Sequence, residues 1–181
     1  GRGLDSKSDV GPLSSESQFH KVRDYIAVGI KEGATLAIGG RQLGGGIYDD
    51  GFYIEPTIFT DVNPSMRIAQ EEIFGPVLTV FKVSDLNDAI NVSNIVKFVL
   101  SSSVYTKDLN RAFHYVNTVD AGMIHVNSPT LGGEVHLPFG GLKASGVGHR
   151  EQGTEAIEFF SEIITVYIDY SDTATGQAKL V

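Results

Sequence analysis

The chain has 181 residues, of which 41% are hydrophobic and 20% charged, and its formal net charge is −8. This composition is typical of a globular domain with a buried core and excludes an intrinsically disordered chain. The acidic balance argues against nucleic acid as a partner, because phosphate binding needs a basic surface. No apolar run reaches the length of a membrane span, so no membrane partner is expected and a cytoplasmic location is the default expectation. The chain has no cysteine, which excludes disulfides and thiol chemistry within it.

The first 72 residues are expected to form one long helix followed by short elements. Ser15 offers an N-cap with Gln18 three residues later, and apolar residues then recur at helical spacing, which predicts a helix over residues 16–32. Gly33 is expected to end this helix. The other elements expected here are a strand at 34–38, a glycine-rich loop at 39–46, a hairpin turn at 50–51, an edge strand at 57–59 and a short helix at 66–72.

Residues 76–127 predict strands that alternate with helices. Residues 77–81 are apolar, β-branched and aromatic, which indicates a buried strand. Such alternation is typical of an α/β fold, so we expect a mostly parallel sheet with flanking helices and right-handed crossovers. The elements expected after 81 are a helix capped by Ser84, a strand at 99–106, a helix capped by Asp108 with an apolar stripe of Leu109, Ala112, Phe113 and Val116, a strand at 122–126, a long loop at 128–149, a helix at 151–160 and a last strand at 163–170.

Two loops have the character of a ligand site. Residues 70–77 read Gln-Glu-Glu-Ile-Phe-Gly-Pro-Val, which places carboxylates and an aromatic where a helix meets a strand, and ligands tend to collect at such junctions. Residues 137–146 read Leu-Pro-Phe-Gly-Gly-Leu-Lys-Ala-Ser-Gly, an apolar loop whose glycines let the backbone approach a ligand closely. No histidine has the spacing of a zinc-binding helix, so no metal site is expected.

In this order and spacing, the two motifs resemble those of the aldehyde dehydrogenase superfamily. The resemblance extends over nearly the whole chain, from Val-Gly-Pro-Leu at 10–13 to Ile-Thr-Val-Tyr at 164–167. In that family the nucleophilic cysteine, the general-base glutamate and the dinucleotide-binding half lie upstream of the segment that this chain resembles. The resemblance therefore implies the C-terminal part of a longer enzyme, without catalytic residues of its own. Residues 1–161 would be part of the catalytic domain, and residues 162–181 would be an oligomerisation strand and tail.

The resemblance assigns roles to five residues. Glu72 would hold the ribose next to the nicotinamide of NAD or NADP, since a carboxylate can accept two hydrogen bonds from paired hydroxyls. Phe74 would pack beside the same ribose. Asn127, Thr130 and Phe139 would line the aldehyde pocket, where an apolar, aromatic wall is typical of a small-molecule site.

The residues by themselves leave plainer interpretations open. Without the resemblance, Glu72 would be a solvated charge, and Phe74 and Phe139 would be core aromatics. Glu71 is interpreted as a surface charge in either case. Val99 stands where the family commonly has glycine, which puts the local turn in question.

The implied function of the full-length parent is oxidation of an aldehyde to a carboxylic acid. A cysteine thiolate would attack the carbonyl, hydride would pass to nicotinamide, and water would hydrolyse the thioester. The loop at residues 127–139 looks most like the branch that oxidises 2-ketoglutarate semialdehyde. Two alternatives stay open: a non-catalytic module that serves association, and a relative that transfers the acyl group to coenzyme A or phosphate.

The run Ile-Ile-Thr-Val-Tyr-Ile at 163–168 has high β-propensity and no charge. Such a strand should be covered or paired, and in the family the corresponding strand extends the sheet of a neighbouring subunit. The parent is therefore expected to be a homodimer or homotetramer that associates through this strand.

Overall fold

In the computed structural model, which describes residues 1–168, the first part of the chain is built on one long helix, α1 (Glu16–Lys31). The hydroxyl of Ser15 accepts a hydrogen bond from the backbone N–H of Gln18 at 3.2 Å, so the predicted N-cap is confirmed. Gly33 follows the helix with φ at +95°, a left-handed conformation that glycine adopts without strain. α1 therefore ends within one residue of its predicted boundary.

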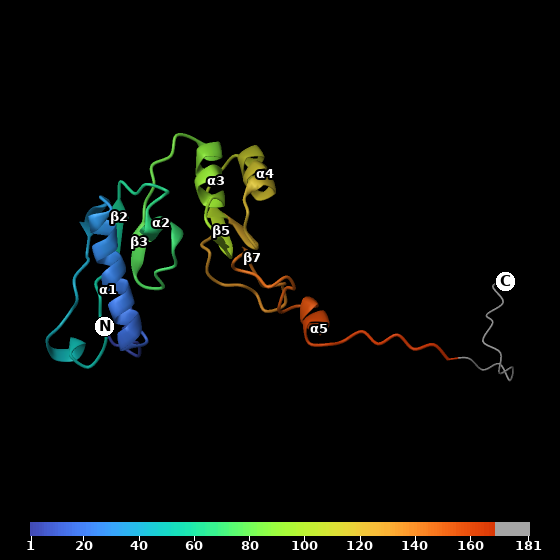
Figure 1. The fold of residues 1–181 in the computed structure, drawn as a ribbon, viewed down its shortest axis with the longest axis horizontal. Helices are drawn as coiled ribbons and strands as arrows, with labels where there is room; N and C mark the ends of the chain where they lie inside the picture. The colour runs from blue at the N-terminus through green and yellow to red at the C-terminus, as the bar shows by residue number, and fades with distance from the viewer. Residues whose placement is uncertain (169–181) are drawn as a thin grey trace.

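A three-stranded sheet with the order β1-β2-β3 packs against α1 (Figure 1). Its strands are β1 (Thr35–Ile38), β2 (Thr57–Thr60) and β3 (Val77–Thr79). β2 pairs antiparallel with β1 and parallel with β3, so the prediction of an edge strand at 57–59 is wrong. Phe59 is fully buried and packs with Val22 and Ile26 of α1, which forces β2 into the middle of the sheet.

Two details of this first part differ from expectation. The hairpin turn predicted at 50–51 is not formed, because Phe52 pairs with the distant Leu13 and the short helix η1 (Gly46–Tyr48) precedes it. The strand predicted as buried at 77–81 is only half covered, since the Leu78 side chain of β3 is 57% exposed. The short helix expected at 66–72 is present as α2 (Arg67–Gln70).

The second part of the described chain forms two small sheets beneath a pair of helices (Figure 1). Its elements are α3 (Leu86–Asn94), β4 (Phe98–Val99), β5 (Ser101–Val104), α4 (Leu109–Thr118), β6 (Met123–Val126), β7 (Leu142–Lys143) and α5 (Glu155–Phe159). β5 and β6 are parallel, and β4 and β7 are antiparallel. Ile90 of α3 and Tyr115 of α4 form a second buried core with β5 and β6.

An α/β fold is therefore observed, but the single, mostly parallel sheet is not confirmed. Across residues 1–168 the strands form three separate sheets, with two parallel and two antiparallel pairings. The strand predicted at 99–106 is interrupted, because its first residues pair with β7 and the following ones with β6. Strand propensity does not specify the partner, which only long-range packing decides.

Of the caps predicted for α3 and α4, the one on α4 is correct and the one on α3 is wrong. Asp108 accepts hydrogen bonds from the backbone N–H groups of Asn110 and Arg111, so the cap of α4 is confirmed. The cap of α3 is Asp85, whose carboxylate accepts from the Asp88 N–H at 2.9 Å, and not Ser84 as predicted. α5 begins four residues later than expected.

The late start of α5 has a structural cause. The backbone of Glu151, expected to open the helix, instead exchanges two hydrogen bonds with Phe139 at 2.6 and 2.8 Å. This bridge joins the middle of the long loop at residues 128–149 to the segment before α5. The first turn of α5 is acidic, with Glu155 and Glu158.

The apolar stripe predicted on α4 is present but mostly uncovered. Ala112 and Tyr115 face the core, whereas Leu109 is 71% and Phe113 59% exposed. The predicted helix is correct, but its buried face contains Ala112 and Tyr115 and only partly overlaps the predicted stripe. Within the described residues no helix reaches the length and apolarity needed to cross a membrane, and no group of three or more histidine or acidic side chains could hold a metal ion.

Residues 163–168 extend away from the rest of the chain after α5 (Figure 1). They pair with no other described strand, and Ile163 and Tyr167 are 96% and 92% exposed. The strand predicted at 163–170 is therefore not formed over its first six residues, and its last two lie outside the described residues.

Candidate functional site

The loop at residues 71–76, called here the Glu72 loop, connects α2 to β3. Within it, Ile73 is buried in the first core, whereas Phe74 is 73% exposed. Phe74 has φ at +55°, a left-handed conformation that is unusual for an aromatic residue. The Glu72 carboxylate is exposed, and no donor among residues 1–168 forms a hydrogen bond or an ion pair with it. The loop thus presents an exposed carboxylate with no partner among the described residues and, two positions later, an exposed aromatic ring.

Glu71, the neighbouring carboxylate, has the opposite environment. It accepts hydrogen bonds from Arg67 at 2.8 and 3.0 Å and from the hydroxyl of Tyr25 at 2.6 Å. The Arg67 guanidinium and the Tyr25 hydroxyl together lower the pKa of Glu71 to about 2. The same contact with Glu71 raises the pKa of Tyr25. Interpreting Glu71 as a plain surface charge was wrong, because these bonds make it an anchor between α1 and α2.

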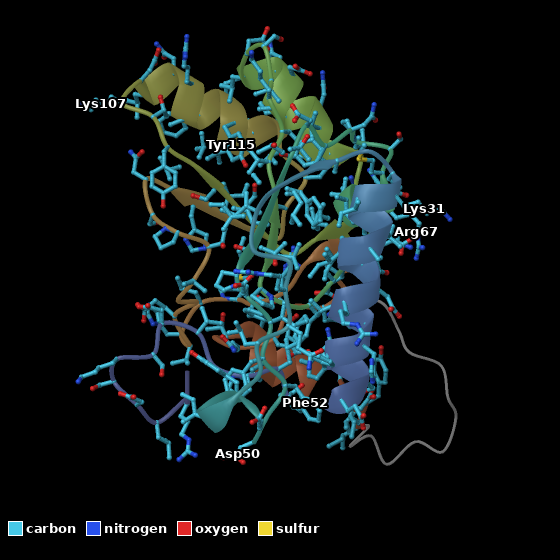
Figure 2. All side chains as sticks on the ribbon, turned by 90° about the vertical axis from the view of Figure 1, so that its left-hand side faces the viewer. Lys31, Asp50, Phe52, Arg67, Lys107 and Tyr115 are labelled. Atoms are coloured by element: carbon cyan, nitrogen blue, oxygen red, sulfur yellow. The ribbon has the colours of Figure 1, made fainter. Side chains whose placement is uncertain are left out.

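Arg67 is in turn held at the end of α1. Its backbone N–H donates to the carboxylate of Glu32 at 2.9 Å, which places it near Lys31 at the C-terminal end of that helix (Figure 2). Its guanidinium also lies 5.5 Å from the centre of the Tyr25 ring, within the range of a cation–π contact. α2 and the start of the Glu72 loop are therefore tied to α1.

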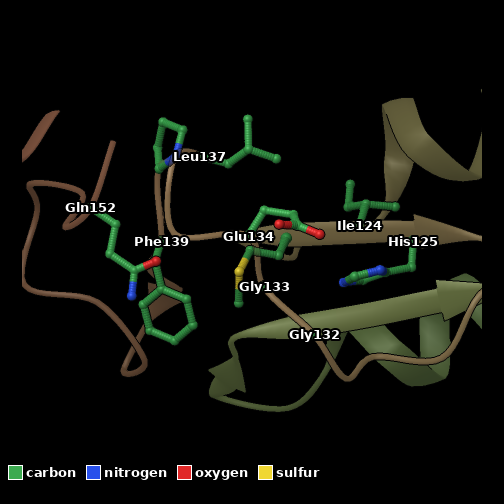
Figure 3. A pocket seen from close by; sticks show the side chains of 11 residues that line it. Ile124, His125, Gly132, Gly133, Glu134, Leu137, Phe139 and Gln152 are labelled. Atoms are coloured by element: carbon green, nitrogen blue, oxygen red, sulfur yellow. The ribbon is translucent and has the colours of Figure 1, made fainter. Parts of the chain in front are cut away.

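A separate cavity of about 510 Å³ lies beside β6 and the long loop (Figure 3). Its lining includes Phe139 on one side and His125 on the other, with the carboxylate of Glu134 between them (Figure 3). The rest of the lining is formed by Gly122, Met123, Ile124, Gly132, Gly133, Leu137, Pro138 and Gln152. This is a mostly apolar slot with a few polar groups, the usual make-up of a small-molecule pocket.

Of the three predicted pocket residues, the structure places Phe139 at this cavity. Asn127 lies at the end of β6 with φ at +58°, and its amide exchanges hydrogen bonds with both backbone groups of Thr106, at 2.8 and 3.0 Å. It holds the turn after β5 and does not line the cavity. Thr130 is exposed and is also outside the lining.

His125 and Glu134 line the cavity and were not singled out from the sequence. Glu134 follows Gly132 and Gly133, and this glycine pair was the one signal in the sequence that the loop bends here. His125 lies on β6, where alternation of side chains gave no reason to prefer it to its neighbours. Glu72 does not line this cavity, so the predicted cofactor and substrate residues occupy two separate places in the described chain.

Val99 fits its position without distortion. Its side chain is 6% exposed, and its backbone N–H donates to the hydroxyl of Ser145 at 3.0 Å. It pairs with Leu142 across β4 and β7. The valine is thus a core residue, which answers the question raised by the missing glycine.

Known proteins resemble this chain in sequence and in fold. The aldehyde dehydrogenase family model matches residues 1–166. The alpha-ketoglutaric semialdehyde dehydrogenase of Bacillus subtilis (strain 168) is 44% identical over 164 residues, which cover 90% of this chain and 34% of that relative. The betaine aldehyde dehydrogenase of Brucella abortus (strain S19) is 45% identical over 171 residues, covering 93% of this chain and 34% of that relative.

Solved structures of aldehyde dehydrogenases also share the fold of this chain. A double mutant of Staphylococcus aureus betaine aldehyde dehydrogenase, in complex with NAD+, superimposes with a TM-score of 0.84 at 36% identity, covering 88% of this chain and 32% of that one. The Mycobacterium tuberculosis aldehyde dehydrogenase complexed with NAD+ has a TM-score of 0.78 at 42% identity, covering 84% and 31%. The chain spans about a third of the length of the relatives it matches. With its Glu-Glu-Ile-Phe-Gly-Pro motif and with these matches along nearly all of its length, the chain belongs to the aldehyde dehydrogenase family.

Proposed function

We propose that this chain is one part of an enzyme that oxidises an aldehyde to a carboxylic acid with NAD or NADP. The observation that carries the proposal is the exposed carboxylate of Glu72, which has no partner among residues 1–168 and lies two positions before the exposed ring of Phe74. A carboxylate free of internal partners can accept both hydroxyls of a ribose. The two solved relatives named above were crystallised with NAD+, which supports the choice of cofactor.

The chain's own contribution would be to bind and orient the cofactor and the aldehyde. When bound, the cofactor supplies the acceptor for hydride. Glu72 would fix the ribose, Phe74 would pack against it, and Phe139 would form one wall of the aldehyde pocket. The thiol nucleophile must come from residues beyond this chain, which has no cysteine. We infer from the order of the motifs that the chain is the C-terminal part of the parent, and the full reading frame of the gene tests this placement.

The proposal is tested by Glu72→Gln in the full-length enzyme. Turnover should fall on the order of a hundredfold, because misplacing the reacting atoms by about 1 Å has that effect. The affinity for NAD+ should change far less, since Glu72 is one of many cofactor contacts. Steady-state kinetics with a cofactor titration measures both values. A variant with the turnover of the wild type would show that Glu72 is an ordinary surface charge.

Two relatives that are named as alpha-ketoglutarate semialdehyde dehydrogenases support 2-ketoglutarate semialdehyde as the substrate, which the loop at residues 127–139 also suggests. The cavity itself favours a second class, a cationic aldehyde such as betaine aldehyde. Its lining includes Glu134 and the aromatic Phe139, but no lysine or arginine among the described residues. A carboxylate and an aromatic face both attract a quaternary ammonium group and disfavour an anionic substrate such as a semialdehyde that carries a carboxylate.

Glu134→Gln separates these two substrates. If the cationic aldehyde is bound here, the variant should raise its KM roughly fivefold, in line with about 1 kcal/mol for an exposed charge contact. If the anionic semialdehyde is the substrate, removal of a repelling carboxylate should instead lower its KM. Gln152→Leu is a control at the same cavity that leaves its charge unchanged. Steady-state kinetics of the wild type, Glu134→Gln and Gln152→Leu with each of the two aldehydes decide which substrate the cavity binds.

We also propose that residues 163–168 pair with a neighbouring subunit in the parent. Five of these six residues are large, apolar and between 65% and 96% exposed, which is a hazard for an unpaired strand. Backbone pairing with a second subunit would cover them. The rival interpretation, a non-catalytic association module, shares this surface and differs by lacking an upstream cofactor domain and cysteine.

A further inference from the structure

One face of α1 contacts the Glu72 loop at three places. The first is Gln18, whose side-chain amide donates to the carbonyl of Ile73 at 2.9 Å and to the carbonyl of Phe74 at 2.8 Å. An amide NH₂ has two donors, and both are directed at consecutive carbonyls of this loop. Gln18 thus holds the backbone at the two residues that directly follow Glu72.

The second contact is Val22, one turn further along α1. Its side chain is fully buried, and Gly75 packs directly against it. A Cβ atom at Gly75 would overlap the methyl groups of Val22. Only a glycine therefore lets the loop come this close to the helix.

The third contact is Tyr25, which donates to the Glu71 carboxylate at 2.6 Å. Glu71 is also paired with Arg67, so the first residue of the loop is fixed from both helices. Gln18, Val22 and Tyr25 are spaced four and three residues apart, which places them on one face of the helix.

The helix thus contacts the loop at residues 71, 73, 74 and 75 and leaves the side chains of Glu72 and Phe74 exposed. Phe74 is held in a left-handed conformation, which is costly for a residue with a Cβ atom and persists only where the surroundings enforce it. The bond from Gln18 to the Phe74 carbonyl is one such constraint. We propose that α1 is the template that sets the position of Glu72, with Gln18 as its main positioning residue. This inference rests on the proposed role of Glu72 in ribose binding.

The test uses Gln18→Leu in the full-length enzyme, which removes both donors and keeps a side chain of similar size. The value of kcat should fall roughly tenfold while the Kd for NAD+ stays within about threefold, because a displaced ribose carboxylate misaligns the nicotinamide. Amide hydrogen exchange in peptides that cover residues 72–76 should become faster. The second readout does not depend on catalysis.

The matched control is Gln70→Leu. Gln70 is also a half-buried glutamine next to the same loop, and its amide donates to the carbonyl of Pro64 at 2.6 Å. It should leave kcat and the exchange of residues 72–76 unchanged. Tyr25→Phe, which removes only the bond to Glu71, is a milder second variant should Gln18→Leu not fold, and it should change both readouts in the same direction.

The outcomes separate the inference from the function on which it rests. If Glu72→Gln loses turnover and Gln18→Leu does not, the template is wrong and the ribose role stands. If Glu72→Gln keeps its turnover, the proposed role of Glu72 fails and exchange alone decides: faster exchange in Gln18→Leu supports the template. Wild-type exchange over residues 72–76 in Gln18→Leu overturns it whatever the kinetics show.

Discussion

Glu71 and Glu72 are neighbours in the chain, yet Glu71 is hydrogen-bonded to other side chains and Glu72 has no partner among the described residues. α2 ends at Gln70, so the two side chains no longer follow a helical course and take different directions. Glu71 reaches Arg67 and Tyr25, whereas Glu72 meets no donor within the described part of the chain. Glu71 was expected to be a plain surface charge, but it links two helices because Tyr25 of α1 and Arg67 of α2 both donate hydrogen bonds to it.

The anchor should make stability depend on pH. The folded pKa of Glu71 is about 2, below its usual value of 4.5, so the folded state favours the charged form. Its contribution is fully present above pH 4.5 and is lost as the pH falls toward 2. Glu71→Gln should therefore be less stable than the wild type near neutral pH, and the difference should shrink below pH 4.5. Urea unfolding of both proteins across this range measures it, and a difference independent of pH would contradict the assignment.

At the scale of elements, the loop at residues 137–146 depends on close backbone packing against the start of β6. Gly122, directly before β6, lies against Gly140 and Gly141, and its backbone N–H donates to the Val99 carbonyl at 3.2 Å. A Cβ at Gly122 would fall well inside contact with the Gly140 carbonyl oxygen. The loop that carries Phe139 can pack this closely against the sheet because Gly122 has no side chain.

Gly122→Ala should therefore destabilise the protein by about 2 kcal/mol, the typical effect of overpacking where the neighbour is backbone. It should also disturb the cavity, since the displaced segment adjoins Phe139. Gly132→Ala is not a suitable control, because its φ is +84° and would itself be strained. Gly3→Ala is suitable, since nothing lies within 4 Å of its added Cβ. The midpoints of thermal unfolding of Gly122→Ala and Gly3→Ala are compared. Equal midpoints would show that the backbone around Gly122 accommodates a Cβ atom without loss of stability.

At the scale of the whole molecule, large apolar surfaces remain uncovered, and the clearest is at residues 163–168. Leu109 and Phe113 of α4 are also exposed. The chain spans about a third of its relatives' length, so a longer parent or a second subunit has ample surface with which to cover them. Removing the strand tests the part of this surface that we assign to assembly.

Truncation of the parent after Glu162 should lower its assembly state, from a tetramer or dimer to smaller species. Residues 163–168 belong to neither of the two described cores, so the subunit should remain folded, whereas the proposed interface would lose its backbone pairing. Light scattering gives the mass, and circular dichroism monitors the fold. A truncated protein that is folded and keeps its original mass would show that this strand is not the interface.

The sequence by itself determined the features that depend on neighbouring residues. The cap and length of α1, the Asp108 cap and the positions of most strands follow from short-range spacing, and the motifs at 70–77 and 137–146 together indicated the family. The tertiary structure decided which strands pair, that β2 is central, that Asn127 holds a turn and that Glu134 lines the cavity. These depend on contacts between residues far apart in the chain, and neither propensity nor periodicity carries that information.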